Sequence, residues 1–186
     1  NVNDTWTQVG SDIDGEAVGD RSGWSVSLSA DGSIVAIGAY GNDGNGTDSG
    51  HVRIYKNINN TWTKIGEDID GEAAGDLSGT SVSLSQDGTI VAIGAYKNDG
   101  IGTENGHVRI YKNFNNTWTK IGDDIDGEAS YDFSGESVSL SSDGSVVDIG
   151  AYNNSGGGID RGHVRIYKNV NNNWTKIGDD IDGEAN

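Results

Sequence analysis

The stretch that decides the fold reads SGWSVSLSADGSIVAIGAY at residues 22–40 and, after a glycine-rich loop, GHVRIY at residues 50–55. Both blocks return twice, at residues 78–111 and 134–167. Four tryptophans keep the same interval, because Trp6, Trp62, Trp118 and Trp174 lie 56 residues apart. A fixed period over a whole chain is typical of repeat proteins, whose units bury their apolar surface by stacking on neighbours.

Each repeat contains four segments with the composition of short β-strands. Residues 25–29 alternate serine with Val26 and Leu28, which indicates a strand with one apolar face. Residues 34–39 are continuously apolar, as in a strand buried on both faces. Asp31-Gly32 separates these two segments and predicts a type I′ hairpin turn. Residues 51–56 alternate again, and a tryptophan strand is expected at residues 61–65, with a counterpart at residues 5–9.

Four short antiparallel strands in each period, with no helical periodicity, predict an all-β fold, a β-propeller built of four-stranded antiparallel blades. The alternative, a β-solenoid, has much shorter and parallel rungs. We expect residues 1–186 to form a single propeller segment. Its three repeats cover approximately residues 3–58, 59–114 and 115–170, and a partial fourth covers residues 171–186.

The charge of the chain limits its partners. The net charge is −17, with 12 basic against 29 acidic residues. Nucleic acid and anionic membrane surfaces are bound by clustered Lys and Arg, so we expect neither partner. There is no cysteine, hence no disulfide framework and no thiolate metal site. Because the chain also lacks methionine, we expect it to be processed or cut from a longer parent.

The order of the blocks resembles the FG-GAP repeat of the integrin α-subunit propeller. That pattern runs Phe-Gly-x-Ser-Val, then Gly-Ala-Pro, then Gly-x-Val-Tyr-Ile-Tyr, and it covers all three repeats here. The resemblance implies that residues 25–29 form the innermost strand of a blade, residues 34–39 the second, residues 51–56 the third and the tryptophan strand the outermost. It also implies an extracellular or cell-surface location and a role in binding.

The chain departs from the family pattern at several positions. Serine replaces the phenylalanine of the first block and tyrosine replaces the proline of the second (Ser22, Ser78, Ser134; Tyr40, Tyr96, Tyr152). Calcium-binding members carry a long Asp-rich loop between the first two strands, where this chain has only residues 30–33. Calcium takes six to eight oxygen ligands, so the family's calcium site is not carried over.

A second acidic loop recurs in every repeat and is a candidate Ca²⁺ site. It alternates carboxylates with glycine over residues 12–20, and carboxylate oxygens are ligands that Ca²⁺ prefers. The other interpretation is an Asp-Gly turn whose side chains bond nearby backbone amides between blades. The candidate ligands are Asp12, Asp14, Glu16, Asp20, Asp68, Asp70, Glu72, Asp76, Asp124, Asp126, Glu128 and Asp132.

The remaining polar residues suggest no catalytic centre. His51, His107 and His163 occupy equivalent places in different blades, so we expect each to bond a neighbouring loop rather than converge on one ion. No nucleophile elbow, Walker loop or His-Glu-x-x-His motif is present, and we expect no enzymatic activity. Two positions break the symmetry of the repeats: Trp24, and Asp148 within an apolar strand.

Three blades do not close a propeller, because natural rings begin near four. The chain is therefore expected to close a ring with copies of itself, a dimer of three-bladed chains being favoured, or with further repeats of a longer parent. The function we expect is that of a non-enzymatic extracellular binding or adhesion module, which recognises a protein or a glycan through propeller loops. The alternative is a structural spacer in a large surface protein, with no small ligand.

Overall fold

The computed structural model describes residues 5–156, 159 and 161–184. Within these residues the chain is all-β, with fifteen strands in three sheets and no helix. The membrane search, confined to the same residues, accordingly returns no helix with the length and apolarity of a membrane span.

Each sheet contains four main strands and one two-residue strand. The first sheet contains β1 (Ser25–Leu28), β2 (Ile34–Ala39), β3 (His51–Ile58), β4 (Thr61–Lys64) and β5 (Ile69–Asp70). The second contains β6 (Ser81–Leu84), β7 (Ile90–Ala95), β8 (His107–Phe114), β9 (Thr117–Lys120) and β10 (Ile125–Asp126). The third contains β11 (Ser137–Leu140), β12 (Val146–Ala151), β13 (His163–Val170), β14 (Asn173–Lys176) and β15 (Ile181–Asp182).

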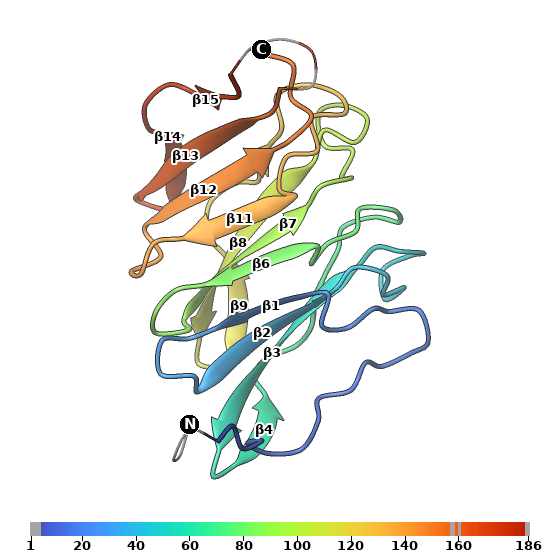
Figure 1. Ribbon diagram of the computed structural model, residues 1–186, viewed down its shortest axis with the longest axis vertical. Helices are drawn as coiled ribbons and strands as arrows, with labels where there is room; N and C mark the ends of the chain where they lie inside the picture. The colour runs from blue at the N-terminus through green and yellow to red at the C-terminus, as the bar shows by residue number, and fades with distance from the viewer. Residues whose placement is uncertain (1–4, 157–158, 160, 185–186) are drawn as a thin grey trace.

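The strands are antiparallel and lie in chain order, β1-β2-β3-β4 in the first sheet, while β5 pairs with the other end of β3. The other two sheets repeat this arrangement. In Figure 1 the sheets follow one another along the long axis, with the first repeat in blue and the third in orange and red. The predicted fold is confirmed: these are three propeller blades, with the strand order that the sequence implies, and they do not close a ring.

The core lies between the blades rather than inside one of them. At the first junction Ala36, Val52, Ile54 and Ile69 of one blade pack against Val82, Leu84, Val91 and Ile93 of the next. The second junction repeats this packing with the equivalent residues. The continuously apolar second strand is buried along its whole length in the middle blade, as its composition predicts. A single repeat therefore has no core of its own, and its stability depends on its neighbours.

Glycine and serine join the blades where their inner strands begin. A β-carbon on Gly38 would collide with the carbonyl oxygen of Gly79 in the next blade. The hydroxyl of Ser25 donates to that same oxygen at 2.7 Å, and Ser27 accepts from the backbone N–H of Leu84 at 2.9 Å. Each contact recurs one repeat later. The inner serines thus bridge blades by hydrogen bonds, which explains their alternation with apolar residues.

The tryptophans join the blades at the outer edge. The indole N–H of Trp118 in β9 donates to the carbonyl of Ile65, which follows the outer strand of the preceding blade, at 2.8 Å. Trp62 and Trp174 make the same bond with residues 53 positions earlier. A strand predicted at residues 5–9 is wrong, because Trp6 is 86% exposed and its segment forms no strand. The third strand that such a segment would pair with does not precede it in the described residues.

The turn between the first two strands is a hairpin, but the predicted type I′ geometry is wrong. The N–H of Gly32 donates to the carbonyl of Ser29, and Gly32 alone has a positive φ, of 70°, in the turn. This is a type I turn followed by a left-handed glycine, the usual form of a longer hairpin loop. Asp31 stabilises the turn, because its carboxylate accepts from the N–H of Ser33 and from the hydroxyls of Ser29 and Ser33.

The turn carboxylates make stability depend on acid pH. The Ser33 N–H bond, followed by the two hydroxyl bonds, lowers the pKa of Asp31 from 3.8 to about 2, and Asp143 has the same bonds and a pKa of about 2. Because the folded pKa lies below the unfolded one, this stabilisation is present above about pH 4 and is lost as pH falls toward 2. We expect the Asp31→Asn/Asp143→Asn variant to lose less unfolding free energy than wild type between pH 5 and 2 in urea titrations. The exposed Asp179→Asn variant should follow wild type; parallel curves for all three proteins would contradict the assignment.

Candidate binding sites at the blade junctions and the loop end

A buried arginine holds each acidic loop in place. Arg53 of β3 donates to the backbone carbonyl of Asp14 at 2.7 Å and lies 3.5 Å from the carboxylate of Glu16. Arg109 and Arg165 repeat both contacts in the later blades. The arginine of the HVRIY block therefore fixes the backbone of the loop and orients one of its carboxylates.

The last carboxylate of each acidic loop is buried and serves the loop itself. Asp20 accepts from the N–H of Ala17 at 3.0 Å and from the side-chain amide of Asn42 at 3.1 Å. Asp76 and Asp132 have the same partners in their own repeats. These contacts are the loop hydrogen bonds that the Asp-Gly turn interpretation describes.

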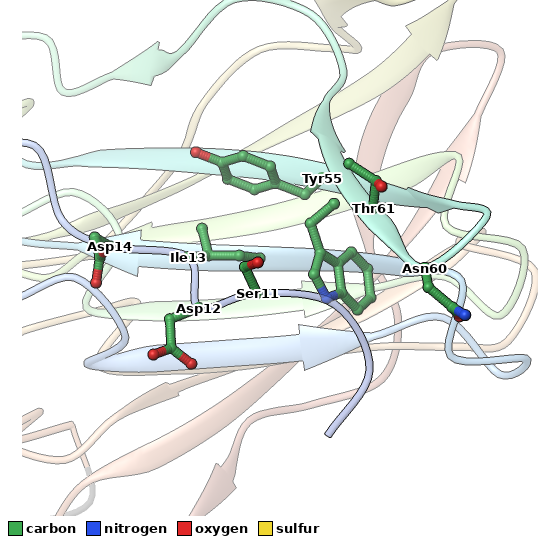
Figure 2. A pocket seen from close by; sticks show the side chains of 8 residues that line it. Ser11, Asp12, Ile13, Asp14, Tyr55, Asn60 and Thr61 are labelled. Atoms are coloured by element: carbon green, nitrogen blue, oxygen red, sulfur yellow. The ribbon is translucent and has the colours of Figure 1, made fainter. Parts of the chain in front are cut away.

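The first carboxylates of the loops lie near the surface and face other partners. Asp12 accepts from the amide of Gln8 at 2.8 Å. Asp68 and Asp124 instead accept from a lysine four residues earlier, Lys64 or Lys120. Figure 2 shows Asp12 and Asp14 at the rim of a pocket of about 270 Å³ beside Trp62, where their side chains point in different directions. An equivalent pocket of about 320 Å³ lies beside Trp118.

Three groups of possible ligand side chains form among the described residues, and each one spans two repeats. They are Glu16, His51 and Asp68; Glu72, His107 and Asp124; and Glu128, His163 and Asp180. In each group the ligand atoms lie within 4.8 Å of one another. We call these groups the junction triads. The carboxylates of one acidic loop do not meet; instead a glutamate of one loop meets an aspartate of the next, beside a histidine.

The junction histidines are uncharged at neutral pH. Burial, with Arg109 as the next cause, lowers the pKa of His107 from 6.5 to about 4. Burial also lowers the pKa of His51. Each histidine lies far from the other two along the arc of blades, and none shares an ion with another, as the sequence predicts. Its partnership with two carboxylates was missed, although the recurrence of Glu, His and Asp at one spacing was visible.

A separate hollow opens at the end of the blades where β2 and β7 finish. Its volume is about 410 Å³, and we call it the aromatic hollow. It is lined by Arg21, Trp24, Tyr40, Asp48, Leu77, Thr80, Tyr96, Lys97 and Glu136. Trp24 packs edge-on against Tyr40, with ring centroids 4.9 Å apart, and Arg21 lies over the Tyr40 ring at 5.2 Å. Burial raises the pKa of Glu136 at its far side.

Further aromatic side chains continue the hollow toward the third blade. Phe133 lies between Tyr96, at 5.8 Å, and Tyr152, at 5.4 Å, with the latter pair stacked. The tyrosines occupy the position where FG-GAP sequences carry proline, so that the departure from the family pattern supplies the ring surface. The sequence singled out Trp24 because it breaks the repeat, and the structure places it in this hollow.

The sequence model of the FG-GAP repeat matches residues 11–55 and 69–111. These segments are FG-GAP repeats. The match covers each acidic loop and the three inner strands of the first two blades, so an FG-GAP repeat here includes the glutamate and histidine of a junction triad but not its aspartate. No curated protein matches the sequence.

Solved structures share the fold of these FG-GAP blades. A protein assigned as a 6-phosphogluconolactonase from Bacteroides uniformis is 15% identical, with a TM-score of 0.55, over 83% of this chain and 39% of that one. Sqt1 of Saccharomyces cerevisiae is 10% identical, with a TM-score of 0.55, over 87% of this chain and 36% of that one. Hydrazine synthase of Kuenenia stuttgartiensis is 10% identical, with a TM-score of 0.53, over 92% of this chain and 38% of that one. The chain spans less than two fifths of each, and at these identities the likeness concerns the fold alone.

Proposed function

We propose that this FG-GAP chain is a non-enzymatic extracellular module that binds a glycan in the aromatic hollow. The observation that carries the proposal is Trp24, which is large, 59% exposed and set against Tyr40 at the mouth of a hollow. Exposed aromatic side chains that converge on one concave site are characteristic of ligand binding rather than of folding.

The chemistry of the lining suits a hydroxyl-rich ring. Aromatic faces give a large contact area at a low entropic cost, and the apolar face of a sugar can lie on them. Asp48 and Glu136 supply acceptors at opposite sides, while Arg21 and Lys97 supply donors. Such charged groups hydrogen-bond hydroxyls strongly. A protein ligand is the competing possibility, and the same surface would meet it.

The test is a glycan array followed by titration of the best binder with the intrinsic tryptophan fluorescence as readout. We expect the Trp24→Ala variant to bind at least about tenfold more weakly, since a central aromatic anchor contributes about 2 kcal/mol or more. Trp6→Ala is the matched control, because Trp6 is exposed and does not line the hollow. Each measurement is made with added calcium and with a chelator, because the acidic loops belong to the proposal as Ca²⁺ sites.

Two outcomes would overturn this function. Absence of binding to every glycan under both conditions would contradict it, as would equal affinities of the Trp24→Ala and wild-type chains. Binding to a protein array alone would replace the glycan by a protein ligand.

A second candidate function is that of a self-assembling structural spacer, and the open faces of the terminal blades favour it. Val26 is 63% exposed, whereas its equivalent Val82 is 9% exposed at a junction. At the opposite end Ile181 is 59% exposed, whereas Ile125 is 5% exposed. We propose that a second copy of the chain covers these faces head to tail, because they are the two halves of the junction already described.

A further inference from the structure

The middle junction contains a pocket with a strongly acidic lining. It has a volume of about 350 Å³ and lies where the acidic loop of the second repeat meets that of the third. The triad of Glu72, His107 and Asp124 lines it, with Asp76, Asn98 and Asp126 behind. It is separate from the aromatic hollow and shares none of its lining residues.

Two buried polar side chains of this pocket lack a hydrogen-bond partner. His107 is 1% exposed, and its Nε2 has none. Asn98 is 6% exposed, and its side-chain oxygen Oδ1 has none, although its amide nitrogen donates to Asp76 at 3.0 Å. The equivalent oxygens of Asn42 and Asn154 accept a backbone N–H at 2.8 Å. Because buried polar groups are nearly always paired, an unpaired oxygen and an unpaired imidazole in one pocket point to a missing ligand.

Basic side chains orient the triad and leave one oxygen of each carboxylate free. Arg109 faces Oε1 of Glu72 at 3.6 Å, while Oε2 faces His107 Nδ1 at 3.9 Å. Lys120 donates to Oδ1 of Asp124 at 2.7 Å. In the third junction Lys176 likewise takes Oδ1 of Asp180, while Oδ2 faces His163. Outer partners that fix ligand orientation in this way are usual at metal centres.

We propose that the middle junction triad binds one divalent transition-metal ion, with Zn²⁺ as the probe, through His107, Glu72 and Asp124. An ion with bonds of about 2.0–2.2 Å holds its ligand atoms about 3.3–4.2 Å apart, so the 3.9 Å gap between Glu72 and His107 is too long for a hydrogen bond and suits a shared ion. A neutral imidazole needs no proton removed before it coordinates. One imidazole with two carboxylates favours zinc or manganese over calcium, which prefers oxygen ligands.

Asn98 distinguishes the middle site from the other two triads. Its unpaired Oδ1 lies in the lining of the same pocket, where it can accept from a water on the ion or bind the ion directly. The first and third triads have the same three residue types, but their asparagine oxygens are already satisfied. The proposal therefore assigns the strongest site to the middle junction, and it holds whether or not the aromatic hollow binds a glycan.

The test is calorimetric titration of the metal-free chain with ZnCl₂, repeated with CaCl₂. We expect one strong zinc site per chain, weaker calcium binding, and a loss of zinc affinity of about 10- to 100-fold in His107→Gln. His51→Gln is the matched control, since it makes the same change in the first triad and should leave the strong site in place. Glu72→Gln changes a half-exposed residue, and circular dichroism verifies that each variant is folded.

Cobalt gives a second readout, because an imidazole ligand changes the visible absorption of bound Co²⁺. We expect the wild-type bands to disappear in His107→Gln and to persist in His51→Gln. The absence of zinc binding below about 1 mM would overturn the proposal. Equal losses in the His51→Gln and His107→Gln variants would also overturn it, as would calcium binding more tightly than zinc. Retention of glycan binding by His107→Gln separates this site from the proposed function.

Discussion

The Gly94→Ala variant is expected to lose about 3 kcal/mol of unfolding free energy, the largest effect of any single methyl group in this chain. Its β-carbon would collide with the backbone carbonyl of Gly135 in the next blade, and with the hydroxyl of Ser81 that bonds this carbonyl. A backbone atom cannot move aside as a flexible side chain can. The whole junction, with its apolar core, must therefore open. Urea unfolding followed by tryptophan fluorescence measures the loss.

Gly150 provides the matched control, because it holds the same place in the last blade and no following blade lies against it. A β-carbon there would meet only Ser137, whose hydroxyl can rotate away. We expect Gly150→Ala to cost less than about 1 kcal/mol at a protein concentration where the chain is monomeric. Equal losses for both variants would show that strand geometry, rather than blade spacing, requires the glycine.

The second large effect concerns the proposed self-association. Light scattering over a range of concentrations is expected to show the wild-type chain in reversible equilibrium with a species of twice its 19.5 kDa mass. Val26→Lys should abolish this species, because the exposed apolar face of the first blade would then bury an unpaired ammonium group. Val170→Lys, at an exposed position on the outer part of β13, is the control and should associate like wild type.

Asp148 gives the experiment a sharper form. It replaces Ala36 and Ala92, which are fully buried at the two junctions, and so places a carboxylate on the open face of the third blade. Covering that face would desolvate the carboxylate. Asp148→Ala should consequently tighten the self-association at least about tenfold, a change of about 1.4 kcal/mol. Monomers at every concentration in both proteins would contradict docking of a second copy, and only further repeats could then cover these faces.

The fold followed from the sequence because period and polarity both survive in single residues. The alternation of Ser25 to Leu28 and the apolar run of Ile34 to Ala39 each specify a strand and its burial. The turn type did not follow, because Asp31-Gly32 suits two hairpin geometries, and the additional Asp31 bonds to Ser29 and Ser33 decide between them. The strand predicted around Trp6 failed because such a strand exists only beside the third strand of another blade.

The candidate sites were harder to predict, because they form between repeats. The acidic residues were grouped by the loop that contains them, whereas the structure pairs Glu72 with Asp124 of the following loop. Neighbours in space are then 52 residues apart in sequence, and no local spacing records that contact. The aromatic hollow likewise draws on three repeats. Only Trp24 indicated it, since a residue that breaks a repeat is visible without any knowledge of the packing.

The sizes of the junction residues also have a geometric consequence. Near the inner strands the blades are separated by glycine and serine alone, whereas at the outer strands each gap holds a whole indole ring bonded to the preceding blade. Sheets that meet closely along one edge and are held apart along the other form a wedge. The wedge angle, set by side-chain volume and repeated every 56 residues, fixes the curvature of the arc. The number of blades in a closed circle is thus written in the difference between a hydrogen atom at Gly38 and the indole of Trp118.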